Sequence, residues 1–253
     1  MAEQGKYLYC VIKEKNPKKF DILGQEGKKV YTINEGDLAI AASDTPKEEY
    51  PFIKEHLTCH QKAIEGIMRQ GYDVLPVRFG TVAKSTEDIR EKILKSKRKE
   101  LLGTFPIAEG RVELGLRALW KDMPGIFQEI VAENREIQKA KREVQKNPLQ
   151  MRVAAVGELV QKTLDAKREK EAQKVLKPLK KLAADFKERE LLKHREIMKD
   201  SMILSSAFLV SKENEKNFDK ITQTLIRRYD NRIKFIYVGP IPPFNFIELA
   251  LIV

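Results

Sequence analysis

The chain has 253 residues, of which 42% are hydrophobic, and a formal net charge of +11. This length suits two domains of roughly 100–150 residues each, and the apolar fraction allows packed cores, which excludes global disorder. Two cysteines, Cys10 and Cys59, make no disulfide framework. The N-terminus shows no secretory pattern and no apolar run reaches the ~18–20 residues of a membrane span, so we expect an intracellular protein.

The positive charge is concentrated in one segment. Residues 133–200 carry 19 Lys/Arg against 12 Asp/Glu, an excess of seven. Basic and acidic residues interleaved at helical spacing are typical of a solvated helix face rather than of a phosphate-binding stripe. We therefore expect only weak, non-specific affinity for polyanions.

The first half of the chain predicts strands followed by helices. "KYLYCVI" (6–12) predicts an opening strand, and "KKVYTI" and "DLAIAAS" around Gly36 predict a hairpin. A capping-box pattern at Thr45 predicts a helix that restarts at Pro51 and ends at Gly71. Its apolar stripe consists of Ile53, Leu57, His60, Ile64, Ile67 and Met68. A second helix is predicted to start at Ser85-Thr86-Glu87-Asp88.

Between these helices, "VLPVRFGTV" (74–82) predicts a β-strand with an unusual composition. Pro76 has no N–H to donate, so the strand is an edge strand, or Pro76 lies at its start or at a bulge. Arg78 among apolar neighbours is interpreted as a buried structural residue that must be paired, with a ligand-facing role as the alternative. Phe79 is placed on the core face of this strand.

The second half of the chain predicts a split βαβ arrangement with a long helical stretch inside it. "VELGLRALW" (112–120), residues 201–211 and "RIKFIYV" (232–238) predict strands, and residues 213–229 predict a helix. The helical stretch begins at Asp122 and is expected to break only at Asn147-Pro148 and near Pro178. Its apolar seams are Leu149, Val153, Val156 and Val160, and then Val175, Leu179, Leu182 and Phe186.

The C-terminal segment combines prolines with an apolar end. Because the prolines of "YVGPIPPFNF" (237–246) supply no donors, we expect the last strand to stop at Val238 and the chain to continue extended. After Asn245, the residues Ile247, Leu249, Leu251 and Val253 alternate on one apolar side. Such an end either docks on its own protein or is a strand offered to a partner.

The sequence carries few of the patterns that mark catalytic or metal-binding sites. The sequence has no phosphate-binding glycine-rich loop, no nucleophile elbow and no zinc-type cysteine pairing. His56 and His60 are one helical turn apart, but further ligands are missing, so His60 is interpreted as a core histidine and Cys59 as a small buried residue. The basic run "KSKRKE" (95–100) is interpreted as a solvated helix end. We expect no catalytic residues, no metal and no cofactor.

"VLPVRFGTV" after a helix and "YVGPIPPFNF" after the last strand, together with "KYLYCVI" and "RVELGLRALW", resemble the gas vesicle accessory protein family of the F and L type (GvpF/GvpL). The resemblance covers nearly the whole chain. It implies an α+β protein with two domains, the second a modified ferredoxin-like fold, and a role as a minor component or assembly factor of the gas vesicle. It implies contact with the small hydrophobic shell protein (GvpA type) and other accessory proteins during nucleation, at the gas-facing side of the wall, and it brings no catalytic residues.

From the resemblance and the residues together we expect three segments: an N-terminal α+β domain (1–108), a ferredoxin-like domain (109–240) with a helical insertion at about 148–200, and an apolar tail (241–253) docked on the first domain. The residues expected to contact the partner are Arg78, Phe79, Phe244, Phe246, Ile247, Leu249 and Leu251. The residues expected to form the structural motif are Pro76, Arg78, Gly80, Gly239, Pro240, Pro243 and Asn245. No specific nucleic acid and no membrane are expected as partners.

Two other classes stay open from the sequence. An enzyme would use Arg78 and His60 in a pocket, but the sequence offers no nucleophile with a neighbouring acid or base. An RNA-binding ferredoxin-like module would use aromatic residues on a strand, and Phe235 and Tyr237 do share a face.

Overall fold

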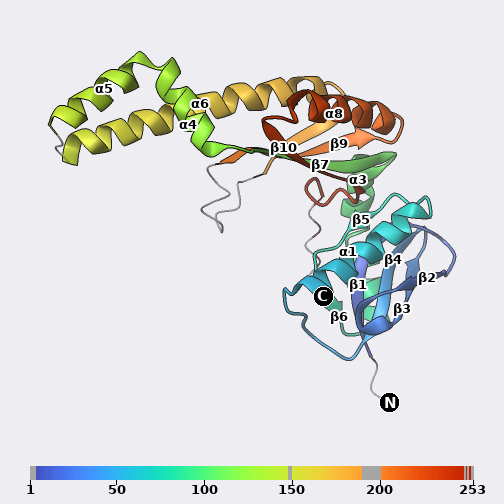
Figure 1. Cartoon of the computed structure of the whole chain (residues 1–253). Coiled ribbons are helices and arrows are strands. Elements are labelled where there is room, and N and C mark those ends of the chain that lie inside the picture. Colours follow the sequence, from blue (N-terminus) through green and yellow to red (C-terminus); the bar gives the residue numbers. More distant parts are fainter. Residues whose placement is uncertain (1–3, 148–149, 190–200, 248, 250, 252–253) are drawn as a thin grey trace. The chain divides into compact units, whose positions relative to one another are not determined.

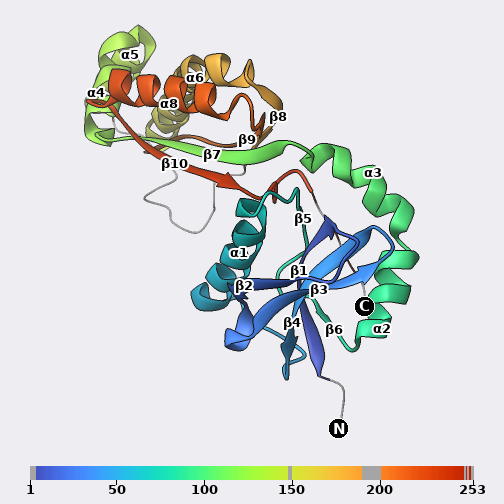
Figure 2. The ribbon, with the colours of Figure 1, turned by 90° about the vertical axis from the view of Figure 1, so that its right-hand side faces the viewer.

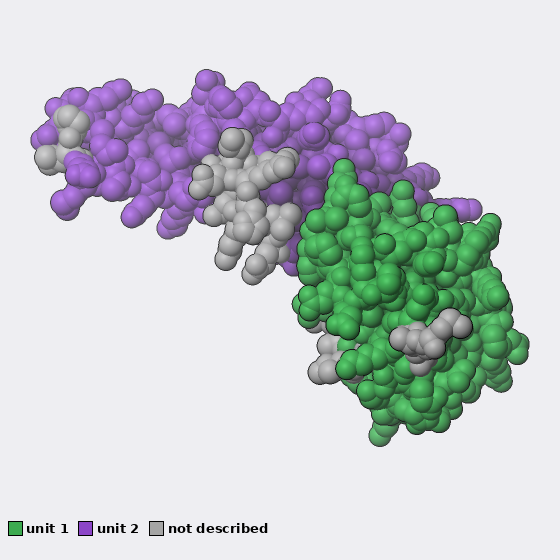
Figure 3. Space-filling model, turned by 90° about the horizontal axis from the view of Figure 1, so that it is seen from below, with its two compact units in different colours: residues 1–113, 239–253 green, residues 114–238 purple. Residues whose placement is uncertain are grey.

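The structure is a computed structural model and describes residues 4–147, 150–189, 201–247, 249 and 251. Three residues of the sequence predictions lie outside these ranges: Pro148 of the expected helix break, Leu149 of the first apolar seam and Val253 of the apolar tail. The chain forms two compact units (Figure 3): unit 1 comprises residues 1–113 and 239–253, and unit 2 comprises residues 114–238.

Unit 1 is built around a six-stranded sheet with the order β2-β3-β4-β1-β5, in which β6 also pairs with β1. Its elements are β1 (Gly5–Lys13), β2 (Lys19–Leu23), η1 (Gln25–Gly27), β3 (Lys29–Glu35), β4 (Leu38–Thr45), α1 (Lys54–Arg69), β5 (Leu75–Pro76), β6 (Val82–Ala83), α2 (Thr86–Asp88), η2 (Ile89–Lys95, a π-helix) and α3 (Arg98–Ala108).

Both faces of this sheet are covered by helices, because β1 carries apolar residues on both sides (Figure 2). Tyr7, Tyr9 and Ile12 pack with α1, whereas Leu8 and Val11 pack with η2 and α3. Nearly all of β1 is buried, which is typical of a central strand between two helical layers.

The N-terminal predictions are confirmed for the first strand, the β3–β4 hairpin and the second helix start, where Ser85 Oγ accepts a hydrogen bond from Asp88 N. The predicted helix start at Thr45 is wrong, because α1 begins at Lys54. Thr45 ends β4 and pairs with Gly5 in the sheet, and its hydroxyl accepts from Lys47 N instead of starting a helix. Pairing with β1 therefore overrides the local capping pattern.

Unit 2 contains a four-stranded sheet with the order β10-β7-β9-β8. Its elements are β7 (Arg111–Trp120), α4 (Met123–Glu133), α5 (Arg135–Lys146), α6 (Gln150–Lys180), β8 (Ala183–Glu188), β9 (Met202–Ser211), α8 (Glu215–Tyr229) and β10 (Ile233–Ile241). The first residues of β7 and the last residues of β10 belong to unit 1. Figure 1 shows α6 and α8 on the same face of this sheet. The chain order and sheet order are those of the split βαβ, ferredoxin-like fold predicted from the sequence, so the α+β class is confirmed.

The helical region differs from the prediction at three places. A break at Asn134, between α4 and α5, was missed. The helix does end near Pro178, at Lys180, but the chain then forms β8 and does not continue as a helix. Phe186, predicted as part of a helical seam, lies on β8, where its ring packs 5.1 Å from the ring of Phe208 on β9. The predicted seam of Val175, Leu179, Leu182 and Phe186 thus begins on α6 and ends on β8, although its spacing is helical throughout.

The prediction that the last strand stops at Val238 is also wrong, because β10 continues through Pro240 to Ile241. Gly239 adopts a positive φ of 132°, a conformation that a residue with a side chain rarely adopts.

Candidate functional site

The segment 74–82 is two short strands joined by a turn, not the single strand predicted. β5 lies at the edge of the sheet as Pro76 requires, with Pro76 opposite Cys10. The Thr81 N–H and hydroxyl both point back to the carbonyl of Arg78, at 3.4 and 2.8 Å. Gly80 completes the turn at a φ of 82°, which explains the glycine.

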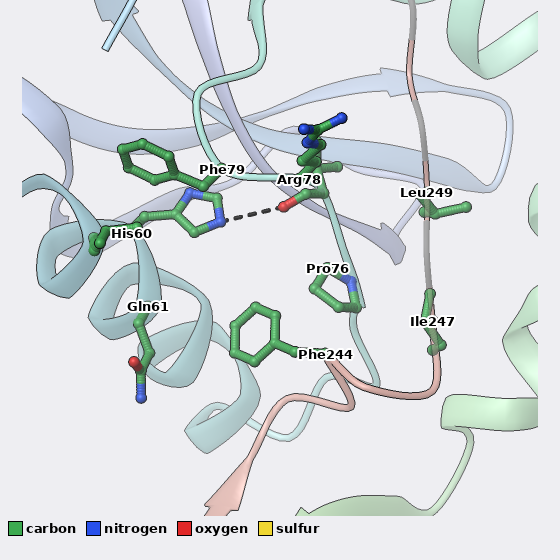
Figure 4. A pocket seen from close by; sticks show the side chains of 10 residues that line it. His60, Gln61, Pro76, Arg78, Phe79, Phe244, Ile247 and Leu249 are labelled. Carbon is green, nitrogen blue, oxygen red and sulfur yellow. Dashed lines mark hydrogen bonds between the residues drawn. The ribbon is translucent and has the colours of Figure 1, made fainter. Parts of the chain in front are cut away.

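His60 on α1 holds this turn in place. The Gly80 N–H donates to the Tyr7 hydroxyl (3.2 Å), and this hydroxyl donates to His60 Nδ1 (3.0 Å) when the neutral ring carries its proton on Nε2. The Nε2–H of His60 then donates to the carbonyl of Val77 (3.2 Å), the bond drawn in Figure 4. Burial lowers the pKa of His60 to about 4, so the ring is neutral near pH 7.

The interpretation of His60 as a core histidine is confirmed, since only 4% of the residue is exposed. His56 does not join it: its Nδ1 bonds Gln25 Oε1 at 3.0 Å, and its ring faces Tyr50. Within the described residues there is no group of three or more His, Cys, Asp or Glu that could hold a metal ion. Cys59 is half-buried, and burial raises the pKa of its thiol, so its thiolate is disfavoured.

Arg78 is not the buried, paired residue that the strand pattern indicated. It is exposed, and its guanidinium makes no hydrogen bond or ion pair with any residue that the structure describes. The turn places Arg78 outside the sheet while its neighbour Val77 stays in the core. An exposed guanidinium contradicts the buried, paired role and is compatible with the ligand-facing alternative.

A pocket of about 710 Å³ lies beside this turn (Figure 4). It brings together five of the residues expected to contact a partner, with His60, Gln61 and Leu57 of α1 completing one side; the five are Arg78, Phe79, Phe244, Ile247 and Leu249. A smaller cavity of about 430 Å³ shares Arg78 and Phe79 and reaches Glu48, Glu49 and Leu251. Arg78 and Phe79 thus line two neighbouring hollows.

The C-terminal segment lies against the edge of the unit 1 sheet. Leu249 forms a parallel bridge with Val77, and Ile247, Leu249 and Leu251 join the core cluster around Leu8. These side chains, like Phe246, are 4–8% exposed. A partner would therefore meet Phe79 and Phe244, which are only partly buried, rather than these residues.

Asn245 attaches the tail to a buried carboxylate that the sequence did not single out. The backbone N–H of Asn245 donates to Glu113 Oε2 (2.8 Å), and its Nδ2 donates to Oε1. Glu113 is fully buried on β7. The alternation along β7 predicted that Glu113 lies on the face opposite the apolar residues. No pattern near Glu113 in the sequence indicated that it accepts hydrogen bonds from Asn245. Pro243 also fixes this turn, since its carbonyl accepts from Phe246 N and Ile247 N.

Exposed apolar side chains extend the pocket onto the surface. Phe52, Ile53 and Leu57 are 72%, 44% and 39% exposed, although the sequence placed Ile53 and Leu57 on a buried stripe. The Phe52 ring lies 5.0 Å from the ring of Phe79. We call the set Phe52, Leu57, Arg78, Phe79 and Phe244 the unit 1 binding surface. A surface of this kind, apolar with an unpaired cation, suits association with another apolar molecule.

The RNA-binding alternative finds no support on β10. The Tyr237 hydroxyl donates to Asp219 of α8 (2.5 Å), and its ring stacks on Phe218. Tyr237 therefore packs on the helix-covered side of the sheet and offers no free ring for a base.

The fold and this surface define a two-unit α+β protein with exposed apolar side chains beside an exposed arginine. The sequence matches the family "Gas vesicle synthesis protein GvpL/GvpF" over residues 5–248, and the chain belongs to this family, as its motifs indicated. Membership gives it a role in gas vesicle assembly.

Relatives and solved structures agree with this assignment. The chain is 25% identical to gas vesicle protein F of Nostoc sp. strain PCC 7120 over 97% of this chain and 99% of the relative. It is 23% identical to gas vesicle protein F1 of Halobacterium salinarum, over 97% and 93%. Its fold is similar to the crystal structure of GvpF from Anabaena sp. PCC7120, with a TM-score of 0.86, 24% identity and coverage of 98% and 100%. In the part of the chain that the structure describes, no helix has the length and apolar character to cross a membrane.

Proposed function

We propose that the unit 1 binding surface holds the small hydrophobic shell protein of the gas vesicle before and during assembly of the wall. The observation that carries the proposal is the group of exposed apolar side chains around the two hollows beside Arg78. Family membership supports a role in gas vesicle assembly. The exposed apolar side chains support an apolar contact with the partner.

The physical basis is the cost of exposing an apolar shell subunit to water. Each large apolar side chain that becomes fully buried contributes about 1.5–3 kcal/mol. Phe52, at 72% exposed, and Leu57 keep much of this free energy available for a partner. Arg78 would pair with a carboxylate of the bound segment, which would favour one orientation of an otherwise apolar contact.

In this proposal the protein acts by binding and carries out no reaction. It limits aggregation of the shell protein, assists nucleation of the wall and can remain at the gas-facing side of the wall, with other vesicle accessory proteins as further partners. The neutral, hydrogen-bonded state of His60 supports a structural rather than a catalytic role for this residue.

A co-purification assay with a gas vesicle shell protein of the GvpA type tests the proposal. The double variant Phe52→Ser/Leu57→Ser should lose most of the bound shell protein, and Arg78→Glu should lose part of it. Leu23→Ser is the matched control, because Leu23 is also exposed (61%) but lies on β2, outside the binding surface. Equal recovery by the double variant and the control would reject this surface, and no recovery by the unmodified chain would reject the shell protein as partner.

A further inference from the structure

A groove in unit 2 is lined by residues of α4 and α5, the two helices labelled in Figure 1. Its volume is about 650 Å³. Its apolar residues are all on α4, and we call them the apolar floor: Phe127, Val131 and Ala132. The other described lining residues are amides and cations, with no carboxylate among them: Gln128 on α4, and Gln138, Lys141, Arg142 and Gln145 on α5. The proposed function uses none of them.

The groove has a fixed shape because the two helices are joined rigidly. Asn134 ends α4, and its side-chain oxygen accepts from Glu136 N and Ile137 N at the start of α5. Gln138 Nε2 donates to the carbonyls of Val131 and Ala132 (3.0 and 2.9 Å), which satisfies the last turn of α4. Ile137 is buried beneath the junction. The angle between α4 and α5 is therefore set before any partner binds.

The two cations of the groove differ from Arg232 and Lys167 of the same unit, which are paired with carboxylates. Arg232 bonds both Glu129 and Glu171, and Lys167 pairs with Glu129. Lys141 and Arg142 are exposed and have no ion pair or hydrogen bond among the residues that the structure describes. Their charge is therefore available to a ligand.

We propose that this groove binds an acidic amphipathic helix of a partner protein. A helix that binds between α4 and α5 would place its apolar stripe on Phe127 and Val131. Phe127 is 38% exposed and Val131 is half-buried. Carboxylates beside that stripe would meet Lys141 and Arg142. A nucleic acid fits this groove less well, because two cations neutralise few phosphates and Phe127 is a single aromatic ring for stacking.

The apolar floor and the charges have separate effects on binding. Exposed ion pairs contribute little by themselves, so the floor provides most of the affinity and the two cations select acidic partners over basic ones. Reversing the charges should therefore reverse the preference, whereas altering the floor should weaken binding of every helix.

Fluorescence anisotropy with the full chain tests this inference. The probe is a labelled amphipathic peptide about 20 residues long, with leucines on one face and glutamates beside them. Lys141→Glu/Arg142→Glu should weaken its binding about tenfold or more, and a peptide with lysines in place of the glutamates should recover the loss. Phe127→Ser should weaken binding of both peptides.

The controls separate this groove from the rest of the molecule. Lys139→Glu/Lys146→Glu makes the same change on exposed residues of α5 outside the groove and should keep the affinity within about twofold. Phe52→Ser/Leu57→Ser should bind the acidic peptide normally, which distinguishes a failure of this inference from a failure of the proposed function. The inference is overturned if the unmodified chain does not bind the acidic peptide or if the two charge reversals have equal effects. It is also overturned if a single-stranded oligonucleotide competes with the peptide and Phe127→Ser has no effect.

Discussion

Replacing His60 with glutamine tests whether this histidine is a neutral structural residue. Burial lowers its pKa from 6.5 to about 4. Between these pH values the unfolded chain binds a proton at this ring that the folded chain excludes, so stability falls as the pH decreases from 6.5 toward 4 and is fully present above 6.5. One pKa unit corresponds to about 1.4 kcal/mol, so His60 accounts for ~3 kcal/mol of this loss.

Urea unfolding of both proteins at about pH 7 and about pH 4 measures this effect. Glutamine can still donate its amide hydrogen to the Val77 carbonyl, so the variant should be folded at pH 7, although less stable. The difference in unfolding free energy between the two proteins should then shrink by ~3 kcal/mol at the lower pH. The reason is that protonation of His60 stabilises the unfolded state of the unmodified chain, whereas glutamine does not titrate. Other titrating groups contribute equally to both proteins and cancel in the comparison.

The control is His56→Gln, which removes a less buried histidine from the same helix. It makes the same His-to-Gln exchange one helical turn from His60. If the curves for the His60 variant and the unmodified chain run parallel from pH 7 to pH 4, His60 is not a neutral buried group and the hydrogen-bond chain from Gly80 through Tyr7 is assigned wrongly.

Three further changes test how the turn and the tail are held. Asn245→Ala removes a donor to the buried carboxylate of Glu113 and should lower the unfolding free energy by about 2 kcal/mol in urea titrations; an unchanged midpoint would contradict the role of this bond. Leu249→Ala should cost about 3 kcal/mol through the cavity it leaves and make the C-terminal segment more susceptible to limited proteolysis; protection equal to that of the unmodified chain would show that the tail is not held by its core contacts. Gly80→Ala should cost about 1 kcal/mol through backbone strain alone, since the nearest atom to the added Cβ is 4.0 Å away, and a more stable variant in thermal unfolding would argue against the turn.

The long, regular elements were predictable because their side chains repeat with a clear period. The strand at 112–120, the strand at 201–211 and the helix ending at Tyr229 appear where alternation or helical spacing places them. Short or shared patterns failed for a physical reason: Thr45 satisfies a helix-start pattern but is paired with Gly5 in the sheet. The family was also predictable, because its motifs are local stretches of sequence.

The sequence by itself determined the α+β class, most strands, the family and the buried character of His60. Only the tertiary structure decided that Arg78 is exposed, that Phe52 and Leu57 face solvent beside it, and that Glu113 receives Asn245, 132 residues away along the chain. The reason is that a local pattern specifies which residues share a face of an element, whereas packing between distant segments decides which of those faces is covered and which stays open to a partner.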